Sequence, residues 1–101
     1  MTPHVEIIQE HEHPGAWVFD ARVDDLHARS IRLAWQDYED WSRGTTPPHA
    51  VARAAFIAIL EHHAIEDLPA TFDAARYRRT IPSIDNSIQQ TLGALENDHS
   101  L

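Results

Sequence analysis

Cysteine and lysine are absent from the 101-residue sequence, and glycine occurs only three times. Without cysteine, the chain can form neither a disulfide framework nor a cysteine-ligated metal site. The glycines are widely separated, so the sequence contains no glycine-rich phosphate loop. No apolar run reaches the roughly 18 residues of a membrane span, and the first residues lack the basic and apolar regions of a signal peptide. We therefore expect a cytoplasmic protein without a membrane-spanning segment.

The charge of the chain has one dominant sign. The formal net charge is -8, and all basic residues are arginine. Because nonspecific binding to nucleic acid depends on lysine and arginine that neutralise phosphates, this balance opposes it. It favours a soluble monomer, or a module that docks on a basic partner.

Catalytic patterns are also missing. No serine is framed as a nucleophile. The carboxylates Asp37, Glu39 and Asp40 fall on a short surface helix without a nucleophile at a matching spacing, so we interpret them as a solvated face. The sequence predicts a protein that is not an enzyme and needs no cofactor.

Three segments in the first third of the chain have the pattern of strands. Residues 16–24 alternate most clearly, with Trp17, Phe19, Ala21 and Val23 on one face. Residues 4–11 alternate weakly and predict an edge strand, and residues 27–34 alternate again. These segments predict a three-stranded antiparallel meander with one covered face and one solvated face.

From residue 35 the apolar period changes to that of helices. Residues 35–42 predict a short helix ended by Gly44, and Thr46 and Pro47 then predict the start of a long apolar helix over residues 47–63. A loop over 64–70 leads to a short helix from about residue 72 with Asp73 as its cap, and residues 83–95 predict a final amphipathic helix. The predicted fold is one α+β domain over residues 1–101, a meander followed by three to four helices, with residues 1–4 and 97–101 frayed.

Eight histidines raise the possibility of a metal site. His11 and His13 are two residues apart in an extended segment and would point to one side, as paired ligands do. His62 and Glu66 are four residues apart, which is a ligand spacing if the helix continues. The alternative is that these histidines are exposed and unrelated, because no His-Glu-x-x-His motif is present.

Two groups of side chains are candidates for contact with a partner. Arg76, Arg78 and Arg79 form the only basic concentration; they either pair with surrounding acids or offer a patch to an acidic partner. Trp35 and Trp41 flank the short helix. Trp35 stands at the junction of strand and helix, where it either covers the core or is partly exposed, and exposed tryptophan is enriched at interfaces.

The segment from Ser30-Ile-Arg-Leu through a helix, Gly44 and Thr46 to a long helix resembles a ribbon-helix-helix DNA-binding unit. The resemblance implies an intertwined dimer in which Ala28, Ser30 and Arg32 face the major groove. The helix start near Thr46 would then lie on a phosphate.

A second resemblance covers about residues 16–90. The chain resembles a family of small bacterial α+β proteins of unknown function, which implies a compact domain and no particular activity. The matching pieces are Trp17-Val-Phe, Ile31-Arg-Leu, Asp37-Tyr38, Gly44 before Pro47-Pro48, Val51, Phe56, Leu60-Glu61, Phe72-Asp73 and Ile81-Pro82-Ser83.

Three functional hypotheses follow. The first is a small acidic, noncatalytic protein-interaction or accessory module, which binds another protein or itself through exposed sheet or the Trp35 and Trp41 region, with Arg76 and Arg79 as further contacts. The second is a ribbon-helix-helix regulator or antitoxin. The third is a small metal-binding protein that uses histidine.

Overall fold

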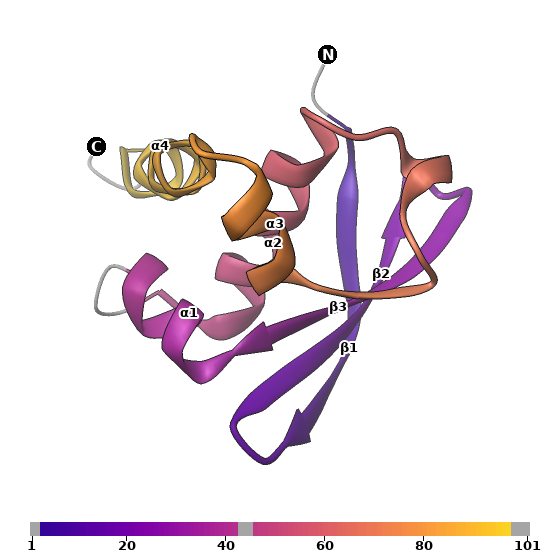
Figure 1. The fold of residues 1–101 in the computed structure, drawn as a ribbon, viewed down its shortest axis with the longest axis horizontal. Helices are drawn as coiled ribbons and strands as arrows, with labels where there is room; N and C mark the ends of the chain where they lie inside the picture. Colours follow the sequence, from indigo (N-terminus) through magenta and orange to yellow (C-terminus); the bar gives the residue numbers. More distant parts are fainter. Residues whose placement is uncertain (1–2, 43–45, 98–101) are drawn as a thin grey trace.

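The computed structural model describes residues 3–42 and 46–97 of the chain. In this part the chain forms one four-stranded sheet, and the helices gather on one side of it (Figure 1). The predicted α+β class is confirmed. The predicted helix end at Gly44 and the last predicted frayed residues, 98–101, lie outside the described residues.

The sheet has the strand order β1-β2-β3-β4. Strands β1 (Val5–His13), β2 (Ala16–Val23) and β3 (His27–Ala34) form the predicted antiparallel meander, and β1 is the edge strand that its weak pattern indicated. A fourth strand, β4 (Thr71–Asp73), pairs with β3 in parallel. The prediction of a purely antiparallel three-stranded sheet is therefore wrong at this edge, because three residues are too few to show an alternating pattern.

Both turns of the meander depend on left-handed backbone conformations. Gly15 has a φ of 76° in the β1–β2 turn, which glycine adopts without steric cost. In the β2–β3 turn, Asp24 and Asp25 have φ values of 53° and 61°, and aspartate tolerates this region better than most residues. The Asp24 carboxylate also accepts a hydrogen bond from the backbone N–H of His4 at 2.9 Å, so the turn holds the chain just before β1.

Helix α2 (Pro48–Leu60) is the central helix that the apolar run predicted, although it is shorter than 47–63. It packs on the sheet on one side and on helix α4 (Ile84–Asn97) on the other, which explains why its buried residues surround most of its circumference. The prediction that Thr46 caps this helix is wrong: Pro47 occupies the cap position, and Pro48 is the first helical residue, where a missing N–H costs nothing.

The remaining helices close the core. Helix α1 (Trp35–Trp41) follows β3 directly, a 3₁₀ turn η1 (Ile65–Asp67) lies in the predicted loop, and helix α3 (Ala74–Thr80) follows β4. Asp73 caps α3 as predicted, because its Oδ1 accepts the backbone N–H of Ala75 at 3.0 Å. No helix in the described part of the chain has the length and apolar character needed to cross a bilayer.

Candidate functional site

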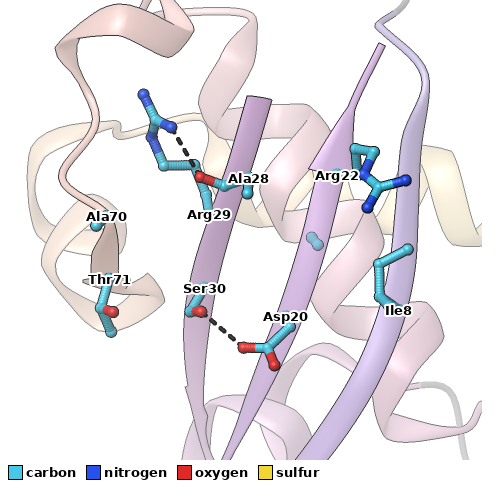
Figure 2. A pocket seen from close by; sticks show the side chains of 9 residues that line it. Ile8, Asp20, Arg22, Ala28, Arg29, Ser30, Ala70 and Thr71 are labelled. Atoms are coloured by element: carbon cyan, nitrogen blue, oxygen red, sulfur yellow. Dashed lines mark hydrogen bonds between the residues drawn. The ribbon is translucent and has the colours of Figure 1, made fainter. Parts of the chain in front are cut away.

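The face of the sheet opposite the helices carries a groove of about 440 Å³. The groove crosses from the bulge in β1 over β2 and β3 to Ala70 and the start of β4 (Figure 2). Small residues form part of its lining, and Ile8, which is 51% exposed, lies at the β1 side. Its lining includes Ile8, Arg22, Ala28, Ser30, Ala70 and Thr71. The predicted solvated face of the sheet therefore carries a shallow, open depression.

A chain of three polar side chains lies at one end of this groove. Asp20 Oδ2 is 2.8 Å from His11 Nε2, and the Ser30 hydroxyl donates to Asp20 Oδ1 at 2.8 Å. The hydrogen bond from His11, followed by that from Ser30, lowers the pKa of Asp20. Because the carboxylate stands between histidine and serine, His11 is not placed to take a proton from Ser30, as a catalytic triad requires. These hydrogen bonds link β1, β2 and β3, so their role is to hold the three strands in register.

A second polar cluster joins three helices on the other side of the molecule. Arg78 Nη1 donates to Asp37 Oδ1 at 3.0 Å and to Asp40 Oδ2 at 2.8 Å, and Arg78 Nε lies 3.3 Å from Asp85 Oδ1. The guanidinium also lies over the Trp41 ring, 5.3 Å from its centroid. The hydrogen bond from Arg78 lowers the pKa of Asp40, and the same contact raises the pKa of Arg78. We call Asp37, Asp40, Trp41, Arg78 and Asp85 the arginine clamp.

The arginine clamp accounts for one of the three arginines of the predicted basic patch and corrects one interpretation of the acids. Arg78 pairs with acids, whereas Arg76 and Arg79 are exposed. The interpretation of Asp37 as part of a solvated face is wrong: Asp37 is 6% exposed, and its Oδ2 accepts no hydrogen bond within the described residues. The helical pattern of α1 gave no signal for this environment, because the arginine that pairs with Asp37, Arg78, comes from α3.

Trp41 and Trp35, the two tryptophans predicted as contacts, have opposite environments. Trp41 is 1% exposed and its Nε1 donates to Asp85 at 2.6 Å, so its ring offers no surface to a partner. Trp35 is 48% exposed. Its ring centroid lies 6.1 Å from that of Trp17, which in turn contacts the Tyr38 ring edge-on at 5.3 Å. We call Trp17, Trp35 and Tyr38 the aromatic corner.

The candidate metal ligands do not form a metal-binding group in the described part of the chain. His11 bonds Asp20, and His13 is exposed at the end of β1. Helix α2 ends at Leu60, so His62 and Glu66 lack the helical spacing on which their pairing depended. Across residues 3–42 and 46–97, no three histidine, aspartate or glutamate side chains form a group that could hold a metal ion.

The ribbon expected from the ribbon-helix-helix resemblance lies inside the sheet. Strand β3 has β2 on one side and β4 on the other, so it is not free to pair with the same strand of a second copy. Arg32, one of its predicted outward residues, forms an ion pair with Asp73 at 2.9 Å. The arrangement does not favour a DNA-reading ribbon.

The comparisons with known proteins give no relative on which to draw. The chain matches no family model, and no curated protein or solved structure matches it.

Proposed function

We propose that the protein is a noncatalytic module that binds another protein through the aromatic corner. The observation that carries this proposal is the exposure of Trp35, which leaves 48% of its surface in water. Burying a large aromatic ring against a partner removes much apolar surface from water, and tryptophan is among the residues that dominate binding energy at interfaces.

Trp35 is also held in place before any partner arrives. Its backbone N–H donates to the Gly15 carbonyl at 3.0 Å, and its ring contacts Trp17. Tyr38, the third member of the aromatic corner, donates its hydroxyl hydrogen to the Thr46 carbonyl. A ring that is already fixed loses little conformational entropy on binding, so more of the contact energy becomes affinity.

Affinity capture with matched variants tests the proposal. Leu26 is the matched control, because it is 80% exposed but lies in the β2–β3 turn, away from the aromatic corner. We expect Trp35→Ala to lose at least one protein that the wild type and Leu26→Ala both recover from an extract of the source cells. If Trp35→Ala recovers the same proteins at the same level, the aromatic corner is not the binding surface.

The groove on the open face of the sheet is the competing surface for the same function. Ile8 lies at its side, as does Arg22, which has no ion pair with any other described residue. Ala28 lines the groove and is exposed, so Ala28→Arg fills it without disturbing the core. Loss of partners by Ala28→Arg, with retention by Trp35→Ala, would move the binding site to the groove.

A further inference from the structure

The arginine clamp shows how this fold holds a guanidinium. Arg78 lies over the Trp41 ring at 5.3 Å, and its nitrogens meet carboxylates of Asp37, Asp40 and Asp85. Asp37 precedes Trp41 by four residues, so a carboxylate and an indole lie on neighbouring turns of α1. An arginine placed there gains a ring contact and an ion pair together.

Helix α1 carries the same combination a second time, at its other end. Glu39 follows Trp35 by four residues, so the two side chains are neighbours on one face of the helix. Both are exposed. Within the described residues, neither side chain has an arginine contact: the one cation–π contact found there is that of Arg78 with Trp41.

A second carboxylate stands beside the aromatic corner. Glu12 is the register partner of Trp17 across β1 and β2, and directly opposed residues project from the same face with their Cβ atoms about 5 Å apart. Glu12 is exposed and has no ion-pair partner among the described residues. Among the described residues, Trp35 therefore has one carboxylate without an ion-pair partner on its own helix, Glu39. Its neighbour Trp17 has a second, Glu12, in a chain whose net charge is -8.

We propose that the aromatic corner binds an arginine side chain from a basic segment of a partner protein, with the guanidinium stacked on Trp35 and paired with Glu39 and Glu12. The proposal rests on the proposed function and names the partner's chemistry. Charge complementarity selects this occupant: a second copy of the chain would bring further negative charge to the corner, and an acidic segment would be repelled.

The test uses a short acetylated and amidated peptide, Gly-Arg-Gly-Arg-Gly, and its isosteric control in which citrulline replaces arginine. Citrulline keeps the planar shape and removes the charge. We expect the arginine peptide to shift the ¹⁵N–¹H indole resonance of Trp35 saturably, to leave that of buried Trp41 unchanged, and the citrulline peptide to shift neither. The Trp35→Phe variant assigns the resonance.

Charge variants then distinguish binding of the peptide at the aromatic corner from its general attraction to an acidic protein. We expect Glu12→Gln/Glu39→Gln to weaken binding of the arginine peptide by about fivefold, in the range for two exposed ion pairs. The matched control is Glu6→Gln/Glu66→Gln, which removes the same charge from exposed positions elsewhere and should weaken binding by less than about twofold at 0.15 M salt. Equal weakening by both pairs overturns the proposal, as does equal binding of the two peptides or no binding of either.

The peptide titration and the affinity capture can fail independently, so a wrong ligand can be told from a wrong docking surface. If Trp35→Ala loses protein partners in affinity capture while the arginine peptide does not bind, the docking surface stands and its cationic ligand is wrong. If Trp35→Ala recovers every partner, the docking surface itself is wrong, whatever the peptide does.

Discussion

Two hydrogen bonds to Asp20 contribute to the dependence of the stability of the fold on acid pH. The bond from His11, followed by that from Ser30, lowers its pKa in the folded chain below the unfolded value of about 3.9. Its contribution to the free energy of unfolding is therefore present above the unfolded pKa and lost as the pH falls through the lower folded pKa. We expect Asp20→Asn to reduce the loss of stability between about pH 6 and about pH 2.5, measured by urea unfolding.

Ser30→Ala, which removes only one of the two hydrogen bonds, should give a pH dependence between those of the wild type and Asp20→Asn. Identical pH dependence in all three proteins would show that these bonds do not set the acid response.

For single residues, the sequence predicted which face of an element a side chain takes better than it predicted how deeply that side chain is buried. The alternation in β2 placed Phe19 and Val23 in the core and Asp20 on the solvated face, and the structure agrees. It gave no signal for the burial of Asp37 or for its pairing with Arg78, which lies 41 residues further along the chain. Charge pairs between distant segments leave no periodicity in the sequence.

At the scale of the element, Asp73 has two roles that can be separated. Its Oδ1 caps α3, and its Oδ2 pairs with Arg32 at 2.9 Å. Asparagine keeps the capping oxygen and removes the charge. We expect Asp73→Ala to lower the free energy of unfolding by about 1 kcal/mol, and Asp73→Asn by about half as much, since the ion pair is largely exposed.

Urea unfolding of both variants measures the difference. Equal losses for Asp73→Ala and Asp73→Asn would mean that the cap contributes nothing and that the charge alone matters.

The cap of α3 was predictable because it depends only on residues adjacent in the sequence. Strand β4 was not predictable. Asp73 precedes a helical run in the sequence, which is the usual position for a cap. Strand β4 has only three residues, and its existence depends on β3 presenting a free edge. The candidate groove shares this origin, because one side of it is Ala70 and Thr71. Neither strand β4 nor the groove could be predicted from the pattern of neighbouring residues in the sequence.

At the scale of the whole molecule, the arginine clamp ties α1, α3 and α4 together. Removing Arg78 leaves the Asp37 carboxylate buried without its partner. We expect Arg78→Met to lower the free energy of unfolding by about 2 kcal/mol. Asp37→Asn in the same chain should recover part of this loss, because a neutral amide costs less to bury than an unpaired charge.

A double-mutant cycle over Arg78→Met and Asp37→Asn isolates the coupling. Strictly additive effects of the two substitutions would contradict a direct interaction between the side chains.

The parallel pairing of β4 with β3 also bears on the order in which the molecule is assembled. The meander joins neighbouring strands through short turns, whereas Arg32 and Asp73, partners across β3 and β4, are 41 residues apart. Because closing a long loop costs more entropy than closing a short turn, local pairs form before distant ones. During synthesis, the three N-terminal strands leave the ribosome well before Ala70 and Thr71. The groove on the open face therefore forms only after Ala70 and Thr71 have been synthesised. A ligand that needs the complete groove would not bind a nascent chain that lacks these residues.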